Sequence, residues 1–194
     1  MSTKTIDQFD PFADRLCRDI RNNLSKALMT SLRHLDLTPA EDVADQYLTP
    51  ELHHIYRQYI HDRMASYRRA LQTISKNHIE ETLRKALVLW DEELFFEVHE
   101  ILEHAWLKSS GKTKLMLQAM IRAAGMYVQL DHGNTKGAAS MAAKAVVVLE
   151  ANRSMVQDVF DIDLLLARLK DVSPKPPKLT EGYKDLQSKN ALVE

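Results

Sequence analysis

Residues 114–130 read KLMLQAMIRAAGMYVQL, and this stretch decides the fold class. At about 100° per residue, apolar side chains cover nearly the whole circumference of a helix built from it. A helix that is apolar all round belongs in the interior of a protein. Its exceptions, Gln118, Arg122 and Gln129, are four and seven residues apart and share one narrow stripe. This stripe requires polar partners, since an unpaired buried polar group costs about 1–3 kcal/mol.

The segment after this helix begins TKGAASMAAKA at Thr135, and its small residues permit two helix backbones to approach closely. The two helices are therefore expected to form a central apolar hairpin. Only five glycines and almost no alternation of Val, Thr and Ile leave little room for strands. The sequence predicts an all-α fold, an irregular multi-helix bundle built around this hairpin.

Capping residues in front of prolines mark the expected helix starts at Asp10-Pro11, Thr38-Pro39 and Thr49-Pro50. Thr38 and Glu41 also have the spacing of a capping box. Asp91 is expected to cap the acidic helix, and Asn134 the helix that follows the central one. The expected helices cover residues 11–35, 39–47, 50–73, 77–89, 92–107, 113–131, 135–150 and 161–171.

This helix order predicts four parts of the chain. Residues 1–75 form an N-terminal helical extension, and residues 76–151 form the core helical domain. A C-terminal helix lies within residues 152–172. Residues 173–194, which begin SPKPPK, form a polar, proline-containing tail that lies over the surface.

Composition excludes several protein classes. The formal charge of −1 lacks the basic excess of a nucleic-acid binder, so a nucleic-acid partner is not expected. Such a role would require four arginines of one helix, Arg57, Arg63, Arg68 and Arg69, to converge on one face. The one cysteine, Cys17, excludes an internal disulfide and fits a small core residue in a reducing compartment.

The beginning of the chain lacks a signal-peptide layout, and no apolar run reaches the roughly 18 residues of a membrane span. A cytoplasmic protein without a membrane segment is therefore expected. Eight methionines and the apolar central helix suit a homo-oligomer and a monomer equally well.

The chemistry is concentrated between Asp91 and Trp106, which reads DEELFFEVHEILEHAW, with six carboxylates, two histidines and no Lys or Arg. On a helical wheel, His99 and Glu103 lie about 40° apart and can touch. They fall in a polar strip flanked by Trp106 and Phe96, which predicts a half-buried pair. The wheel places Glu100 just beyond Phe96. The apolar side chains form one broad core face: Leu94, Phe95, Val98, Ile101, Leu102, Ala105 and Trp106.

Two interpretations of this polar strip stay open. In the functional one, His99, Glu100 and Glu103 bind a ligand, with Gln118 and Arg122 facing them. In the structural one, Glu103 holds the His99 ring and Arg122 neutralises the carboxylates, so the network only fixes helix packing. The wheel places Glu97 and His104 further round the helix, where both are expected to be exposed.

Known metal signatures limit the functional interpretation. The sequence HEILEH departs from H-E-x-x-H, because Glu103 stands where the second histidine is required. The inverted pattern H-x-x-E-H and the di-iron pattern Glu-x-x-His are absent as well. His99 and Glu103 are the candidate metal ligands, for a divalent ion. A third ligand from another helix would be needed, with His78 or His132 as remote candidates.

The same two helices resemble the bacterial and archaeal family catalogued as domain of unknown function 309. The resemblance covers about residues 83–149, roughly a third of the chain. A turn of the type G-N-x-x-G-A is part of it, and Met116 stands where the family pattern has leucine. The matching positions are Phe95, Phe96, His99, Glu100, Leu102, Glu103, Trp106, Gln118, Ile121, Ala124, Gly133, Asn134, Gly137 and Ala138. The resemblance implies a small all-α fold and no particular activity.

We therefore expect a helical protein whose half-buried site at His99, Glu100 and Glu103 binds a metal ion or a small polar molecule. Whether a reaction takes place there stays open. If one does, His99 is the expected base, Glu103 orients it, and Arg122 holds an anion or carboxylate. The alternative is a structural or interaction module that binds a protein partner through a helix-in-groove surface.

Overall fold

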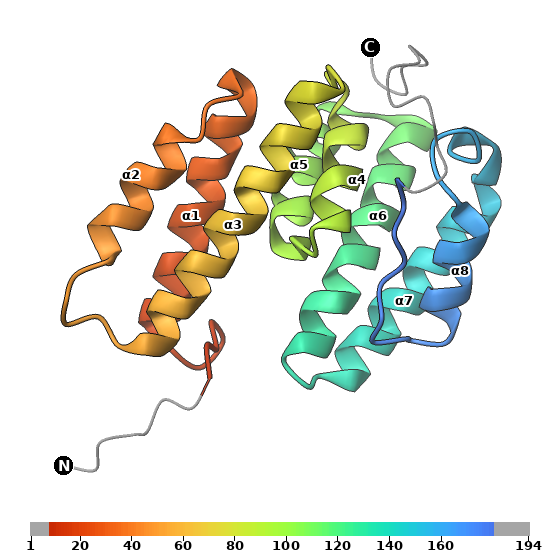
Figure 1. Cartoon of the computed structure of the whole chain (residues 1–194). Coiled ribbons are helices and arrows are strands. Elements are labelled where there is room, and N and C mark those ends of the chain that lie inside the picture. Colours follow the sequence, from red (N-terminus) through yellow and green to blue (C-terminus); the bar gives the residue numbers. More distant parts are fainter. Residues whose placement is uncertain (1–7, 181–194) are drawn as a thin grey trace. The chain divides into compact units, whose positions relative to one another are not determined.

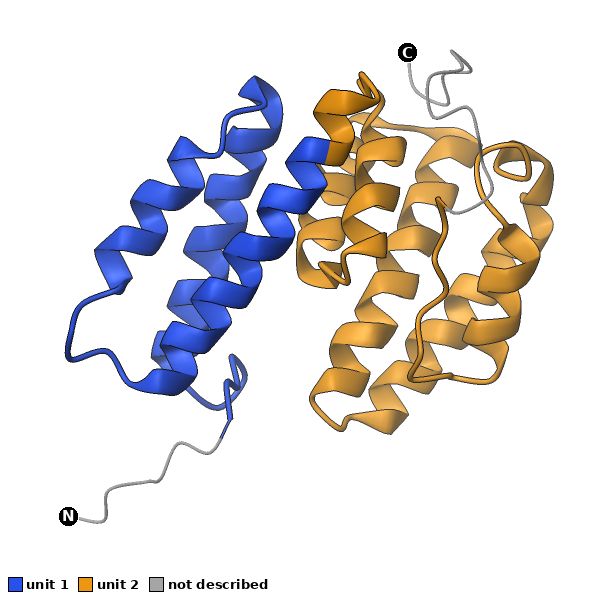
Figure 2. Cartoon of the chain, in the orientation of Figure 1, with its two compact units in different colours: residues 1–72 blue, residues 73–194 orange. Residues whose placement is uncertain are grey.

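The computed structural model describes residues 8–180, which fold into eight α-helices and one 3-10 turn without a strand (Figure 1). This confirms the all-α class and the irregular multi-helix bundle. Within the described range, no helix is long and apolar enough to cross a membrane. The chain divides into two compact units, residues 1–72 and 73–194 (Figure 2). The four parts expected from the sequence stay a prediction.

Unit 1, residues 1–72, contains the first helices of the fold. These are α1 (Arg15–His34), α2 (Thr38–Tyr47) and most of α3 (His54–Lys76). Its core side chains, among them Ile20, Leu24 and Ile60, are fully buried. Cys17 is buried with them, and this burial raises the pKa of its thiol.

The predicted start of the first helix at Pro11 is wrong. α1 begins at Arg15, because Asp14 rather than Asp10 caps it. Asp14 Oδ1 accepts from the backbone N–H groups of Leu16 at 2.6 Å and Cys17 at 3.1 Å. The hydroxyl of Tyr56 on α3 donates to Asp14 Oδ2 at 2.7 Å. A contact from another helix therefore holds the capping side chain in place.

The predicted start of the third helix at Pro50 is also wrong, since α3 begins at His54. Arg57 Nη2 donates to the backbone carbonyl oxygens of Thr49, Pro50 and Leu52, at 2.8, 3.3 and 3.2 Å. Three carbonyl groups that would otherwise be free to enter a helix are thereby held in a loop. Tertiary hydrogen bonds again override the local proline signal.

The capping box expected from Thr38 and Glu41 does not form. Residue 37 is the N-cap of α2, and no side chain of a cap residue bonds to the helix. The backbone N–H and the hydroxyl of Thr38 both donate to Asp36 Oδ1, at 3.0 and 2.8 Å. Glu41 instead forms an ion pair with Arg68 of α3 at 3.0 Å.

Unit 2, residues 73–194, contains five α-helices that follow α3. Consecutive helices pack on one another, and α6 packs on both α5 and α7 (Figure 1). The α6–α7 pair is the predicted central hairpin. The elements are α4 (Thr82–Asp91), α5 (Phe95–Lys108), α6 (Gly111–Asp131), α7 (Thr135–Ala151), the 3-10 turn η1 (Arg153–Met155) and α8 (Ile162–Lys170).

The α6–α7 hairpin packs as closely as its small residues predict. A Cβ atom added at Gly125 of α6 would lie 2.8 Å from Met141 Sδ of α7. Ala138, Ala142 and Ala145 of α7 are buried. Asn134 caps α7, as predicted, by accepting from the backbone N–H of Gly137 at 3.0 Å.

An aromatic cluster joins α4, α5 and α6 in the core of unit 2. Phe95 and Tyr127 stack with ring centroids 4.6 Å apart, and Trp90 meets both rings edge-on at 5.2 and 5.4 Å. The indole N–H of Trp90 donates to the backbone carbonyl of Pro177 at 3.0 Å. The cluster thus connects three helices with the segment that follows α8.

Residues 173–180, which we call the strap, follow α8 and pack against the end of α4. Pro177 and Leu179 are buried, Leu179 completely. The Asp91 carboxylate accepts from the backbone N–H groups of Leu179 at 2.6 Å and Thr180 at 2.9 Å. The predicted role of Asp91 as cap of the acidic helix is therefore wrong: it is the last residue of α4. The remainder of the predicted tail, residues 181–194, lies outside the described residues.

Candidate functional site

The candidate site lies on α5, which begins two residues later than its tight entry turn. α4 ends at Asp91, Glu93 adopts a left-handed conformation at φ 58°, and Leu94 precedes the first helical residue. Phe95, Val98 and Leu102 form the buried face of the helix. The side of α5 that carries His99 and Glu103 lies beside this buried face, so its polar groups remain accessible.

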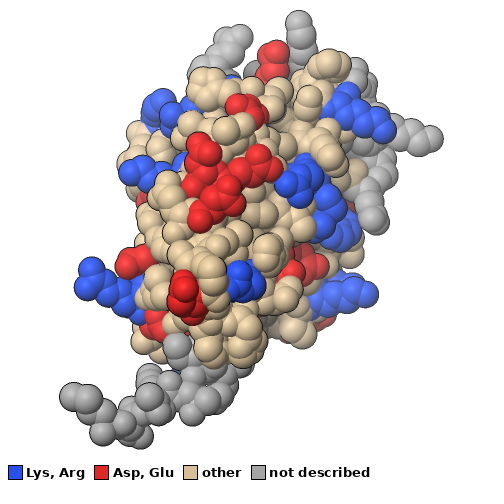
Figure 3. All heavy atoms as spheres, turned by 60° about the vertical axis from the view of Figure 1, so that its left-hand side comes forward, with Lys and Arg blue, Asp and Glu red and all other residues tan. Residues whose placement is uncertain are grey.

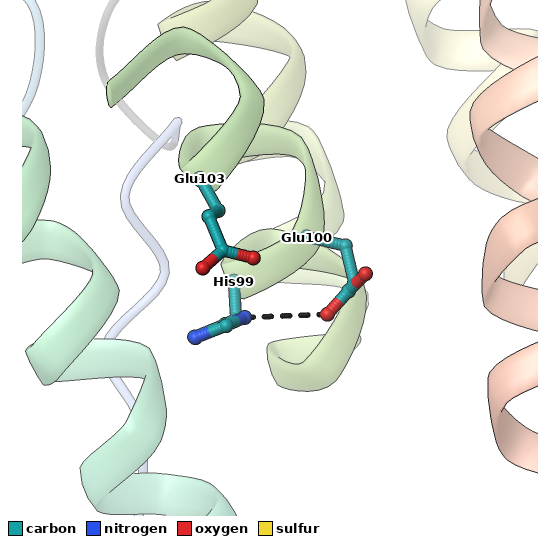
Figure 4. Close-up of side chains that lie close together, drawn as sticks. All are labelled: His99, Glu100 and Glu103. Carbon is teal, nitrogen blue, oxygen red and sulfur yellow. Dashed lines mark hydrogen bonds and ion pairs between the residues drawn. The ribbon is translucent and has the colours of Figure 1, made fainter. Parts of the chain in front are cut away.

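Three side chains on this side of α5 come together. One potential ligand atom from each of His99, Glu100 and Glu103 lies within 4.8 Å of the others (Figure 4). His99 Nδ1 lies 3.3 Å from Glu100 Oε1. The side chains of His99 and Glu100 are 37% and 34% exposed. The structure therefore presents an imidazole and two carboxylates at the surface of one helical turn.

The two carboxylates change the titration of His99. The hydrogen bond to Glu100 raises the pKa of the imidazole above its usual value. Partial burial acts in the opposite direction, and the negative charges of Glu100 and Glu103 add to the rise. A protonated ring donates to the Glu100 carboxylate through Nδ1–H, whereas a neutral ring has a lone pair for a metal ion.

Glu97 is the acidic residue for which the wheel was wrong. It was expected to be exposed, yet it is fully buried. The expected helix started at residue 92, which placed Glu97 in mid-helix. Because α5 starts at Phe95, Glu97 lies in its first turn, where backbone N–H groups and the helix dipole favour a carboxylate. The entry turn was the missing signal.

A second buried charged residue, Arg84 of α4, also escaped the sequence reasoning. Its side chain is 5% exposed, and its Nε donates to Glu81 Oε2 at 3.0 Å. The spacing of Glu81 and Arg84, three residues apart on a helix that is otherwise apolar, is the signal that was available.

The remaining histidines of the sequence prediction lie away from the cluster. His104 is exposed, as expected, and its Nδ1 contacts the backbone carbonyl of Glu100 at 3.2 Å. His78 lies in the turn between α3 and α4 at φ 51°, not at the start of a helix. His132 follows α6 as its C-cap. Within residues 8–180, neither His78 nor His132 joins a group of three donors that could share an ion.

Gln118 and Arg122 are half-buried on α6, which packs against α5. Neither side chain makes a hydrogen bond or ion pair with any residue from 8 to 180. The ion pair between Arg122 and the carboxylates that the structural interpretation requires is thus not formed among the described residues. Their participation in the site stays a prediction.

The four arginines of the nucleic-acid alternative make separate local contacts. Arg57 holds the loop before α3, and Arg68 pairs with Glu41. Arg63 Nε donates to the Tyr59 hydroxyl at 3.1 Å, and Arg69 Nη2 to Ser66 Oγ at 2.8 Å. Figure 3 shows acidic and basic side chains interspersed on the face that it draws.

The comparisons with known proteins place a family match over the site. The model of the family described as "Domain of unknown function (DUF309)" matches residues 83–141, which confirms the resemblance seen in the sequence. The matched range begins in α4, ends in α7 and contains the whole of α5 and α6. No curated protein and no solved structure matches the chain significantly.

Proposed function

We propose that the DUF309-like segment of this chain binds one divalent transition-metal ion through His99, Glu100 and Glu103. The observation that carries the proposal is the convergence of one nitrogen and two oxygen donors within 4.8 Å (Figure 4). All three come from two turns of one helix, so a rigid element holds them. Rigid placement favours metal binding because little ordering is needed when the ion arrives.

The donor set selects the class of metal. An imidazole with carboxylates suits Zn²⁺ and its neighbours in the first transition row, whereas Mg²⁺ and Ca²⁺ prefer oxygen ligands alone. Two donors in a tetrahedral zinc site with bonds of about 2.0–2.1 Å lie roughly 3.3 Å apart. The His99 Nδ1 and Glu100 Oε1 atoms are 3.3 Å apart. This pair therefore needs little rearrangement to receive an ion.

Three protein ligands leave at least one coordination position for an exogenous molecule. This number is typical of sites that bind a substrate or water, while sites with a purely structural ion use four protein ligands. The exposure of His99 and Glu100 agrees with such an open site. It argues against the structural alternative, which requires the polar network to be packed shut and mutually satisfied.

The compartment of this function is proposed to be the cytoplasm. The one cysteine, Cys17, is a buried free thiol, which fits a reducing environment. A reducing compartment does not alter the His–Glu donor set, because none of its members is oxidised under these conditions.

Metal analysis of protein purified without chelator or affinity tag tests the proposal. After incubation with one equivalent of Zn²⁺ and gel filtration, elemental mass spectrometry should find near-stoichiometric zinc in the wild type. The variant His99→Ala/Glu103→Ala should lose it. The matched control is His104→Ala/Glu93→Ala, which removes the same residue types from exposed positions of the same segment. This control should retain the metal.

Circular dichroism shows whether each variant folds. Zinc-free wild type after this treatment would contradict the proposal. Equal zinc content in the wild type and in a folded His99→Ala/Glu103→Ala variant would contradict it as well. A metal-free but strongly destabilised double variant, beside a metal-free wild type, would favour the structural alternative.

A further inference from the structure

We infer that the open coordination position of the ion at His99, Glu100 and Glu103 takes a carboxylate ligand, and that Arg122 of α6 binds the same carboxylate. This inference rests on the proposed metal site and names the class of its exogenous ligand. It is carried by three observations: the register of α5 against α6, the lack of a partner for Arg122, and the charge of the site.

The facing sides of α5 and α6 are fixed by one contact near the loop that joins them. Lys114 Nζ of α6 lies 4.6 Å from the ring centroid of Trp106 of α5. At about 100° per residue, His99 points only about 20° away from Trp106 around α5. The side of α5 that carries His99 therefore faces the side of α6 that carries Lys114.

The polar stripe of α6 lies on this facing side. Gln118 and Arg122 are four and eight residues beyond Lys114, which places them about 40° and 80° from it around the helix. Only Ser109 and Ser110 separate the two packed helices, so they run antiparallel. From the Trp106–Lys114 contact, His99 is about 10 Å along α5 and Arg122 about 12 Å along α6 in the same direction. The two residues thus reach the same level of the hairpin.

Arg122 has no partner of its own among the described residues. It is half-buried, yet it makes no hydrogen bond or ion pair within residues 8–180. Gln118, one turn before it, is in the same condition. A guanidinium group offers five N–H donors in a fixed planar fork, and it is costly to leave them unmatched beside a packed hairpin.

The charge of the site favours an anion rather than a neutral ligand. A divalent ion on two carboxylates and a neutral imidazole is balanced. The guanidinium of Arg122 then adds one uncompensated positive charge, which a single carboxylate neutralises. The planar fork of arginine matches the two oxygens of a carboxylate, and one of these oxygens is also a good ligand for a transition-metal ion.

Anion titration of the cobalt-loaded protein tests the inference, with Co²⁺ as the spectroscopic probe for the metal. Acetate and inorganic phosphate are added separately, and the visible absorption of the bound cobalt is followed. We expect acetate to change this spectrum in the wild type. The variant Arg122→Gln should bind acetate more weakly, on the order of tenfold, because a charged hydrogen-bond donor is lost. Its cobalt affinity should stay close to that of the wild type.

Two further variants make the result specific. Arg122→Lys keeps the charge but not the planar fork, and it should show an intermediate loss of acetate affinity. Arg33→Gln removes an exposed arginine of α1 and should leave acetate binding unchanged. Circular dichroism and cobalt binding show that each variant retains its fold and its metal site.

The outcomes separate this inference from the metal proposal. Equal acetate affinity in the wild type and in cobalt-loaded Arg122→Gln would overturn the inference and leave the metal site standing. Tighter binding of phosphate than of acetate, with the same dependence on Arg122, would overturn the choice of a carboxylate. Failure of the wild type to bind cobalt at all would overturn the metal proposal, and the inference with it.

Discussion

His99 lies between two carboxylates, and these carboxylates set the range of pH in which it carries a proton. Because the hydrogen bond to Glu100 raises its pKa in the folded protein, the protonated ring binds this partner more strongly in the folded than in the unfolded chain. The pair therefore stabilises the fold fully at pH below the ordinary histidine pKa. This contribution is lost as the pH rises through the raised pKa of the folded state.

The first prediction is that Glu100→Gln lowers the pKa of His99. An NMR titration of the ring protons, assigned with a His99→Gln variant, measures it in metal-free protein. Urea unfolding should also show a larger difference between wild type and Glu100→Gln at pH 5.5 than at pH 8.5. An unchanged pKa in the Glu100→Gln protein would show that the hydrogen bond is not maintained in solution.

Two buried tyrosines give the second prediction, as a matched pair. Tyr56 donates to Asp14 at 2.7 Å, and its pKa is raised to about 12, mainly by burial and further by Asp14. The hydroxyl of Tyr127 is buried without a hydrogen-bond partner among the described residues. We expect Tyr56→Phe to lower the free energy of unfolding by about 1–2 kcal/mol, and Tyr127→Phe to leave it within about 0.5 kcal/mol.

Urea denaturation of both variants measures this difference. A cost of Tyr127→Phe as large as that of Tyr56→Phe would mean that the Tyr127 hydroxyl has a partner, such as an ordered water molecule. In that case the buried end of Tyr127 would be a polar site of the core rather than an unsatisfied group.

Among the secondary-structure elements, the turn between α6 and α7 has the clearest local requirements. Gly133 adopts φ 70°, a conformation that side-chain-bearing residues rarely adopt. Asn134 caps α7 through the backbone N–H of Gly137. These two residues belong to the turn motif that the family resemblance identified, so this part of the motif serves the fold and not the ligand.

The third prediction concerns this turn. Asn134→Ala should lower the free energy of unfolding by about 1 kcal/mol through loss of the cap. Gly133→Ala should cost roughly 1–2 kcal/mol through left-handed backbone strain, and Gly133→Asn should cost less, because Asn tolerates this conformation. Thermal and urea unfolding provide the test. Equal costs for Ala and Asn at position 133 would argue against backbone strain as the cause. Zinc binding should be unchanged in all three variants.

At the level of the whole unit, the strap completes the core of residues 73–194 from a distant part of the sequence. Leu179 is fully buried, and its backbone N–H is bound by Asp91, 88 residues earlier in the chain. Trp90 beside it is bound by the carbonyl of Pro177. A segment whose composition is polar and rich in proline is therefore part of the packed interior.

The fourth prediction is that Leu179→Ala lowers the free energy of unfolding by about 2–5 kcal/mol, the usual cost of truncating a buried leucine. Lys175→Ala, at an exposed position of the same strap, should cost less than about 0.5 kcal/mol. In a Trp106→Phe background, the fluorescence of Trp90 should shift to longer wavelength in Leu179→Ala. A Leu179→Ala protein with unchanged stability would show that the strap is not docked in solution.

The sequence by itself determined the features that depend on local periodicity. The apolar circumference of residues 114–130 and the small residues after Thr135 were sufficient to predict the all-α class and the α6–α7 hairpin. The wheel brought His99 and Glu103 to one side of α5, because residues four apart on a helix are always neighbours. The family match over residues 83–141 was visible in the same two helices.

Only the tertiary structure decided what depends on contacts between distant segments. Asp14 rather than Asp10 caps α1, because Tyr56 of another helix holds it. Glu97 is buried because the entry turn places it in the first turn of α5. Leu179 is buried because Asp91 binds its backbone. In each case several local conformations have similar free energy, so a hydrogen bond or a buried surface from elsewhere in the chain selects one. Local periodicity carries no information about that choice.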